Sequence, residues 1–266
     1  MFPNMKNRKN CRIYGVKPYK AAVIHGGPGG PGEMASVAKE LSKNFGVLEP
    51  LQTKNSIGGQ VRELKETLDQ HVDSPIILIG HSWGAWLAFL FTARYSKYVQ
   101  KLILVSSPPF EKKFKEKMEK ERSSHLSARE QKRMEKLLDD LQKPDKQADR
   151  KFLELAKLAG KADAFDPLPH KSDLIEAQFD IYKKVWPEAN EMRTSGALLK
   201  LGKKIICPVV AIHGDHDSHP YRGVKEPLTK TIKKFKFVFL KKCGHRPWIE
   251  RYAKDRFYRI FKNEIV

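Results

Sequence analysis

The chain has 266 residues, of which 51 are Lys or Arg and 31 are Asp or Glu, so its formal net charge is +20. Its three cysteines, Cys11, Cys207 and Cys243, are odd in number and far apart, which excludes a disulfide scaffold and favours a reducing, cytoplasmic location. The longest apolar run, residues 83–91, is far shorter than the ~20 residues of a spanning helix. Residues 1–10 lack the apolar core of a signal peptide, so we expect neither a membrane span nor secretion.

The positive charge is concentrated at the two ends of the sequence. Residues 1–20 carry six basic and no acidic residues, and residues 222–266 carry 14 basic and 4 acidic ones. Basic ends attract polyanions through a sequence-independent, salt-sensitive attraction. The aromatic residues on which a nucleic acid would stack, Phe235, Phe237 and Phe239, fit a buried β-strand better. We therefore predict no specific nucleic-acid partner.

Short apolar runs alternate with helical segments along the chain. The runs predict strands at residues 20–25, 45–48, 75–79, 101–105, 209–212 and 235–240, with a further short strand at 12–16. The segments between them predict helices near residues 33–43, 57–72, 84–95 and 248–261. Continuous apolar strands that alternate with helices are typical of a mostly parallel central sheet with helices on both faces, so we expect an α/β fold.

The interval 111–199 breaks this alternation, because it contains no convincing strand. Residues 111–151 hold 14 basic and 10 acidic residues, mostly at spacings that suit solvated helices with Glu/Lys pairs. We therefore interpret residues 111–199 as a helical cap inserted between two strands of the sheet. Residues 1–110 and 200–266 then form the core.

The sequence Gly80-His81-Ser82-Trp83-Gly84 fits the G-x-S-x-G pattern. The pattern follows a predicted buried strand and begins a predicted helix, which is the context that a nucleophile elbow requires. Small residues on either side of Ser82 allow the tight turn that presents its hydroxyl above the sheet and at the helix N-terminus. Ser82 is therefore the candidate nucleophile.

A serine hydroxyl needs a general base, and the base needs an acid that orients it. His245 follows the last predicted strand, at the same carboxyl edge of the sheet as the elbow. Asp215 and Asp217 both lie in the loop after the strand at 209–212, so either could be the acid. The chain order serine, aspartate, histidine is that of α/β-hydrolases.

The acid-bearing loop also contains several potential metal ligands: His213, Asp215, His216, Asp217 and His219. Their spacing matches no established zinc pattern, so we expect no metal. We place His216 and His219 on the surface of the loop. The reaction that Ser82 would perform needs no cofactor either.

A tetrahedral intermediate needs fixed hydrogen-bond donors for its oxyanion. The backbone N–H of Trp83, directly after the nucleophile, is one expected donor. The glycine-rich loop at residues 25–30 is expected to supply the other, and because Pro28 has no N–H we choose Gly27. The Trp83 side chain is also a candidate for contact with the acyl group. The loop fits no phosphate-binding fingerprint.

Four motifs together resemble the α/β-hydrolase superfamily and its proline iminopeptidase-like branch. They are His25-Gly-Gly-Pro-Gly-Gly30, Gly80-His-Ser-Trp-Gly84, Gly214-x-x-Asp217-x-x-Pro220 and Gly244-His245-x-Pro-Trp248. The resemblance covers residues 20–107 and 205–262, with the family's helical cap falling at the interval between them. It implies Ser82 as nucleophile, His245 as base and Asp217, rather than Asp215, as the acid.

The resemblance implies a serine hydrolase that acts on a small ester, an amide or a short peptide. Peptidases of this branch hold the substrate's α-ammonium group with acids of the cap, for which the chain offers Glu176, Asp180, Glu188 and Glu191. An aminopeptidase, a carboxylesterase of small acyl esters and a non-enzymatic ligand-binding protein with this fold are the alternatives. The sequence does not define an oligomeric state.

Overall fold

The computed structural model describes residues 10–265, so the basic residues of the segment 1–9 lie outside the described part. The strands are β1 (Cys11–Tyr14), β2 (Tyr19–Ile24), β3 (Gly46–Pro50), β4 (Ile76–His81), β5 (Val99–Val105), β6 (Val209–Gly214) and β7 (Phe235–Leu240). The α-helices are α1 (Ala35–Leu41), α2 (Ile57–His71), α3 (Trp83–Arg94), α4 (Lys115–Ser124), α5 (Ala128–Gln142), α6 (Ala148–Ala162), α7 (Phe179–Thr194), α8 (Ala197–Lys200), α9 (Arg222–Thr231) and α10 (Lys254–Ile265).

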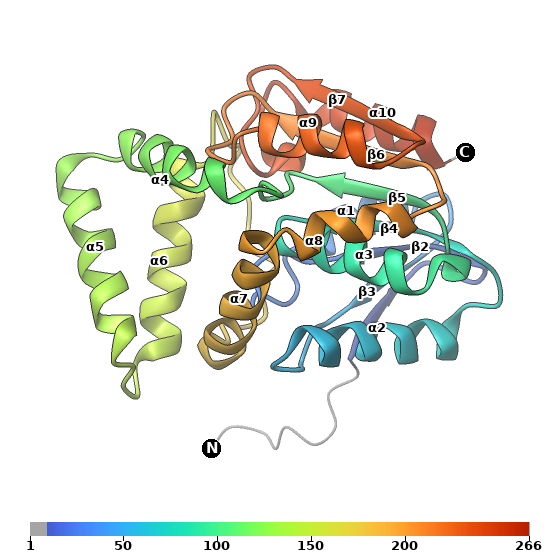
Figure 1. The fold of residues 1–266 in the computed structure, drawn as a ribbon, viewed down its shortest axis with the longest axis horizontal. Helices are drawn as coiled ribbons and strands as arrows, with labels where there is room; N and C mark the ends of the chain where they lie inside the picture. Colours follow the sequence, from blue (N-terminus) through green and yellow to red (C-terminus); the bar gives the residue numbers. More distant parts are fainter. Residues whose placement is uncertain (1–9, 266) are drawn as a thin grey trace.

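The strands form one seven-stranded sheet in the order β1-β3-β2-β4-β5-β6-β7 (Figure 1). The edge strand β1 pairs antiparallel with β3, and every other neighbouring pair is parallel. Parallel neighbours place the loops after β2, β4, β6 and β7 at one edge of the sheet. The expected α/β fold with a mostly parallel sheet is confirmed.

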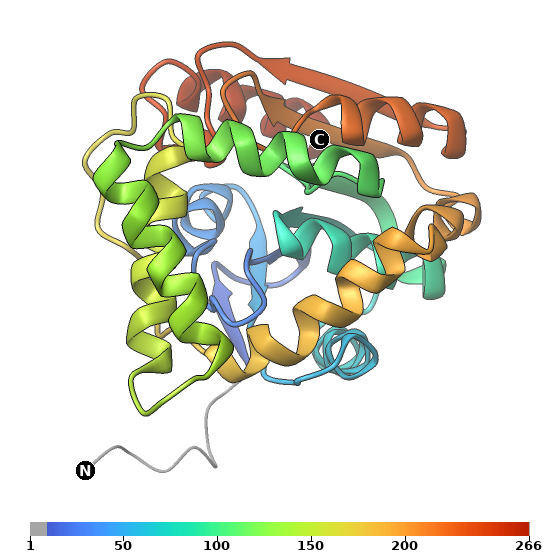
Figure 2. The same ribbon diagram turned by 60° about the vertical axis from the view of Figure 1, so that its left-hand side comes forward.

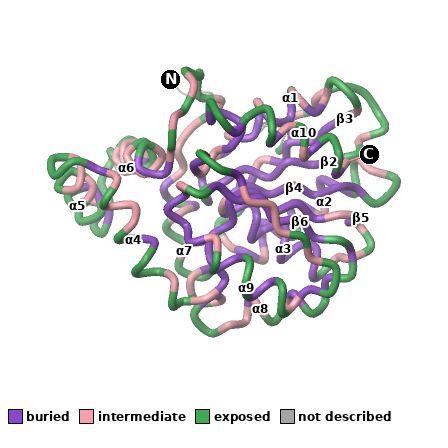
Figure 3. Tube along the Cα trace, turned by 90° about the horizontal axis from the view of Figure 1, so that it is seen from above, coloured by how far each residue is buried: buried purple, intermediate pink, exposed green. Residues whose placement is uncertain are grey.

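Side chains alternate between two cores on the two faces of the sheet. On β2, Ala22 and Ile24 pack with α2, α3 and α9, whereas Ala21 and Val23 pack with α1 and α10. The central strands are therefore buried on both faces, which explains their continuous apolar sequences (Figure 3). Burial on both faces fixes the position of the strand ends, where the predicted site residues lie.

Helices α4–α7 and all but the last residue of α8 lie within residues 111–199, and we retain the proposal that this interval, here called the cap segment, covers the site. Figure 1 shows α4–α7 beyond the arrowheads of β5 and β7, and Figure 2 brings these helices forward, in front of the sheet. Two backbone bonds join the segment to the glycine loop after β2: Gln178 N donates to Gly29 O at 2.9 Å and Ile175 N to Pro31 O at 2.9 Å.

The structure differs from the sequence-based expectation near the C-terminus. The predicted helix at 248–261 is instead a short turn at Pro247–Ile249 followed by α10, which begins only at Lys254. The intervening Glu250 is fully buried, and its carboxylate accepts backbone N–H groups from the cap segment and from the loop before it. Helix α9 was not expected from the sequence.

In residues 10–265, no helix combines the length and the apolar character that crossing a membrane requires.

Candidate active site

Ser82 lies between β4 and α3 in a strained backbone conformation, with φ 52° and ψ −121°. A positive φ is costly for serine and persists only where the surrounding packing imposes it. The packing here is close: a Cβ at Gly80 would lie 2.1 Å from the carbonyl oxygen of Gly84, and one at Gly84 would lie 2.4 Å from that of Ile24. The G-x-S-x-G sequence therefore forms the expected elbow geometry.

The structure distinguishes the two aspartates of the β6 loop. His245 Nδ1 lies 2.8 Å from Asp217 Oδ2, and Asp217 is buried. Asp215 is exposed, and its carboxylate accepts the backbone N–H of Cys243. Burial raises the pKa of Asp217, but the neighbouring His245, His219 and His213 outweigh burial and hold that pKa well below its usual value. Asp217 is therefore an ionised acceptor for the His245 imidazole.

His219 is a correction to the sequence analysis, which placed it on the loop surface. It is only 6% exposed, and both its backbone N–H and its Nδ1 lie within hydrogen-bond distance of Asp217 Oδ1, at 3.0 and 2.8 Å. The loop turns back on itself because one carboxylate oxygen accepts two donors from the residue two positions later. His216, expected beside it on the surface, is partly buried and stacks on His125 at 4.3 Å.

Asp217, His219 and His245 each offer a ligand atom, and these atoms lie within 4.8 Å of one another. In this arrangement both imidazoles use Nδ1 to hydrogen-bond the carboxylate. The geometry fits a carboxylate that orients two imidazoles.

His81 connects the elbow to the His245 loop, a contact that the sequence did not reveal. Its Nε2 lies 3.0 Å from the carbonyl oxygen of His245, and the two rings lie 4.7 Å apart. Its Nδ1 lies 3.1 Å from Glu33 Oε2, which also accepts the N–H of Gly26 at 3.1 Å. Because His81 directly precedes Ser82, these contacts bring the elbow, the His245 loop and the glycine loop together.

The two expected oxyanion donors are free. In residues 10–265 no acceptor is hydrogen-bonded to the backbone N–H of Gly27 or of Trp83. Gly27 has a φ of 46°, and a Cβ there would meet no atom within 4 Å, so the space beside it is open. The Trp83 indole, in contrast, is buried and donates to Gln60 Oε1 at 3.1 Å. Its contact with an acyl group stays a prediction.

The Ser82 hydroxyl has no hydrogen-bond partner among the described residues, including His245. Catalytic hydrogen bonds are often formed only when substrate is bound. Of the four acids expected to hold an ammonium group, Asp180, Glu188 and Glu191 are exposed, and Glu188 accepts the N–H of Ile57 at the start of α2. The fourth, Glu176, is partly buried and accepts a hydrogen bond from Gln178 Nε2 at 2.8 Å.

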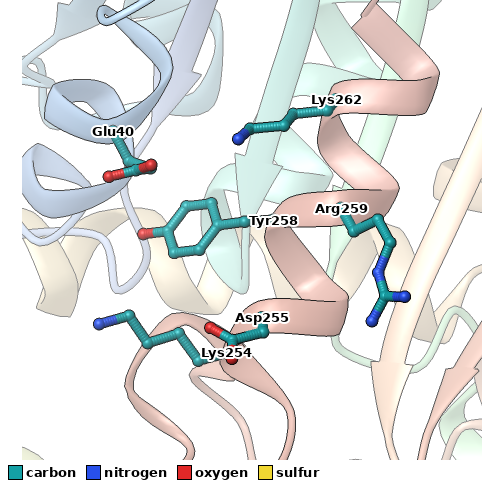
Figure 4. A pocket seen from close by; sticks show the side chains of 6 residues that line it. All are labelled: Glu40, Lys254, Asp255, Tyr258, Arg259 and Lys262. Atoms are coloured by element: carbon teal, nitrogen blue, oxygen red, sulfur yellow. The ribbon is translucent and has the colours of Figure 1, made fainter.

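A surface hollow of about 310 Å³ lies away from these residues, against α10 (Figure 4). It has side chains of both charges, with Glu40 facing the Tyr258 hydroxyl, and none of Ser82, Asp217 and His245 lines it. We assign the chemistry to the strand ends and not to this hollow.

Comparison with known proteins decides the family. A family model described as the alpha/beta hydrolase fold matches residues 23–252. The chain belongs to the alpha/beta hydrolase family. The expected superfamily resemblance is therefore confirmed. The match spans the strand ends that carry Ser82, Asp217 and His245 of this hydrolase, together with the whole cap segment.

Solved structures share the fold at low sequence identity. The hydrolase is similar to VinJ, with 17% identity and a TM-score of 0.68 over 96% of this chain and 93% of that one. It is also similar to a lipase-like protein from Acinetobacter baumannii AYE, with 19% identity and a TM-score of 0.63 over 96% of this chain and 87% of that one. The proline iminopeptidase of Mycobacterium smegmatis is similar with 14% identity and a TM-score of 0.64 over 96% of this chain and 94% of that one. No curated protein matches the sequence significantly. These similarities establish the fold, while the substrate is addressed below.

Proposed function

We propose that this hydrolase is a serine hydrolase that cleaves an ester or amide bond through an acyl-enzyme intermediate. The observations that support the proposal are the strained serine at the end of β4 and a histidine paired with a buried carboxylate, with His81, the residue before the serine, in contact with that histidine. Ser82, Asp217 and His245 follow three different strands, β4, β6 and β7, whose ends lie at one edge of the sheet.

In the proposed reaction, Ser82 Oγ attacks the substrate carbonyl carbon while His245 Nε2 takes the hydroxyl proton. Asp217 accepts the Nδ1–H of His245, which fixes the tautomer with Nε2 free and stabilises the imidazolium. The N–H groups of Gly27 and Trp83 bind the oxyanion. His245 then gives its proton to the leaving alcohol or amine. Water repeats the sequence on the acyl-enzyme, releasing the acid and restoring Ser82.

The glycine loop that carries Gly27 is supported by a buried histidine. His25, which precedes the glycine loop, is buried, with Nδ1 2.9 Å from the carbonyl oxygen of Gly26 and Nε2 accepting the N–H of Gln52. Burial lowers the pKa of His25 to about 4, so its imidazole is neutral at pH 7. A neutral ring held at both nitrogens keeps the loop that carries Gly27 in place.

The test compares wild type with Ser82→Ala, using a fluorophosphonate probe and a panel of short acyl 4-nitrophenyl esters and proline, alanine and leucine arylamides. Ser82→Ala is expected to lose labelling and about 10⁴-fold or more of kcat for every substrate turned over. Ser42→Ala removes a partly exposed hydroxyl at the end of α1, which donates only to the carbonyl oxygen of Lys39, and should match wild type. Labelling that survives in Ser82→Ala contradicts the proposal. A wild type that neither reacts with the probe nor turns over any substrate favours a ligand-binding protein.

A further inference from the structure

Helix α7 of the cap segment buries a charged residue in an apolar row. Ile181, Val185, Ala189 and Arg193 recur every four residues and lie on one face of the helix. The first three belong to the main hydrophobic core, and Arg193 is only 3% exposed. Arginine is almost never fully buried unless it is paired. Its position therefore needs an explanation other than helix packing.

The described residues leave this guanidinium unpaired. Nη2 donates to Asn190 Oδ1, whereas Nε and Nη1 are buried and have no acceptor. The nearest acid that influences it is Glu119 of α4, whose side chain is 57% exposed and lies 3.6 Å from Lys115 Nζ. Burial lowers the pKa of Arg193 from its usual value, although a guanidinium remains charged at neutral pH. Burying a cation whose N–H donors lack acceptors costs several kcal/mol, unless an anion or a water molecule accepts those hydrogen bonds.

Arg193 contacts the helix that begins directly after the proposed nucleophile. Its Cζ is 5.7 Å from the ring centre of Trp86 on α3. Trp86 is four residues after Ser82, which places it about 6 Å further along the helix axis. Trp186 stacks on Trp86 with ring centres 5.9 Å apart and planes at 9°, and the ring centre of Phe110 lies 6.1 Å from that of Trp86. Aromatic rings therefore cluster beside the guanidinium.

We propose that Arg193 binds a carboxylate at the far end of the substrate's acyl group, so that the enzyme prefers monoesters or monoamides of dicarboxylic acids. The inference rests on the proposed serine hydrolase function. A carboxylate supplies the acceptors that Nε and Nη1 lack, and charge-assisted bonds from a guanidinium to a carboxylate are strong. The aromatic rings beside the guanidinium suit contact with a methylene chain. A buried cation at this place disfavours the α-ammonium group of an aminopeptidase substrate.

The first experiment measures binding without turnover. In the Ser82→Ala background, glutarate and succinate are titrated by calorimetry into three proteins: the parent, one with Arg193→Met and one with Lys184→Met. Lys184 is exposed on the same helix, so its loss changes net charge equally without touching the buried row. The expected result is at least a tenfold weaker affinity with Arg193→Met and unchanged affinity with Lys184→Met. Equal affinity in all three proteins, as expected if Arg193 only holds an internal water, overturns the inference.

The second experiment measures selectivity with Ser82 intact. The readout is kcat/KM for mono-4-nitrophenyl glutarate divided by kcat/KM for 4-nitrophenyl butyrate. Arg193→Met should lower this ratio at least tenfold, mainly through KM of the acidic ester, and Arg193→Lys should retain part of it because the charge remains. A parallel loss for both esters would indicate a structural role and contradict the inference. If Ser82→Ala leaves turnover intact, the proposed function fails while the calorimetric result still decides on Arg193.

Discussion

The imidazole rings of His219 and His245 stack with their centres 4.5 Å apart and their planes at 22°, and each ring directs Nδ1 at a different oxygen of Asp217. Asp217 thus divides its charge between two histidines. On its other side, His219 Nε2 lies 3.4 Å from Nη2 of Arg122, which comes from the cap segment. A contact from α4 therefore reaches the proposed catalytic base through one intervening ring.

Replacing His219 by Ala should lower kcat/KM. The His219 side chain lies within hydrogen-bond distance of Asp217 Oδ1 and stacks on His245, so its loss removes a contact that holds the carboxylate opposite the imidazole. A hydrogen bond to a charged group contributes about 1.5–3 kcal/mol, so kcat/KM for an ester substrate should fall about tenfold or more.

His216→Ala is the matched control for this measurement. His216 lies in the same loop and stacks on His125, with no hydrogen bond to Asp217. Its removal should leave kcat/KM unchanged. An equal fall in kcat/KM in both variants, or none in His219→Ala, would show that His219 only fills space.

Breaking the ion pair between Arg122 and Asp163 should destabilise the protein substantially. Arg122 Nε and Nη2 bind the two oxygens of Asp163 at 3.0 and 2.6 Å, and the Asp163 carboxylate is buried. Burial raises the pKa of Asp163, but Arg122 more than compensates and lowers it. Arg122→Met leaves an unpaired buried charge, at an expected cost of about 3 kcal/mol in the free energy of unfolding.

Urea denaturation measures this cost, with Arg133→Met for comparison. Arg133 makes a similar two-bond pair with Glu154, at 2.6 Å for both bonds, but this pair is exposed. Its loss should cost less than about 1 kcal/mol. Adding Asp163→Asn to Arg122→Met should recover part of the stability, because the charge is then removed. Similar losses for the two arginines would contradict the role of burial.

Gly29→Ala should weaken the contact between the glycine loop and the cap segment. Gly29 has a φ of 94°, and a Cβ there would lie 2.2 Å from the carbonyl oxygen of Gln178. Gly196 has a φ of 74°, but a Cβ there would meet nothing within 4 Å. Gly196→Ala should therefore cost about 1 kcal/mol through backbone strain alone. Gly29→Ala should cost clearly more, and kcat should fall about tenfold. Thermal unfolding and ester turnover measure both effects, and equal behaviour of the two variants would refute the steric explanation.

Stability should depend on pH through His25. Its pKa of about 4 in the folded protein is below the usual 6.5, because burial disfavours the imidazolium. The unfolded chain binds more protons between these values, so the contribution of His25 is complete above pH 6.5 and is lost as the pH falls toward 4. The loss amounts to about 3 kcal/mol.

Chemical denaturation at several pH values tests this dependence. His25→Gln should flatten the curve between pH 6.5 and 4, leaving a residual slope from His213, whose pKa burial also lowers. His170→Gln, at an exposed position, should leave the curve unchanged. If the free energy of unfolding still depends steeply on pH in His25→Gln, other groups take up the protons and the prediction is wrong.

Much of the fold could be predicted from the sequence, because strands buried on both faces have continuous apolar sequences. The run at 75–79 and the G-x-S-x-G turn that follows it predicted the elbow correctly in type and place. The start of the last helix was misjudged, since Pro247 and Trp248 continue a helical apolar pattern while the buried Glu250 carboxylate interrupts the helix.

The sequence predicted only part of the side-chain network of the site. Ser82, Asp217 and His245 are marked by local motifs, whereas His219 and His81 gain their contacts from chain segments distant in sequence. Nothing in the pattern around His219 distinguishes a surface histidine from one stacked on His245. Arg193 had a detectable signal, namely a charge in register with Ile181, Val185 and Ala189, but that signal is meaningful only once α7 is known to be buried on this face.

The cap segment supplies backbone partners to two loops of the site at once. Gly29 and Pro31 of the glycine loop accept N–H groups from Gln178 and Ile175, and the N–H of His245 donates to the carbonyl oxygen of Asp163 at 2.8 Å. Any outward movement of the segment that admits substrate must break these bonds. A conformation that admits substrate would therefore be one in which the glycine loop and the His245 loop have lost these hydrogen bonds, so substrate entry and catalysis would need two different conformations.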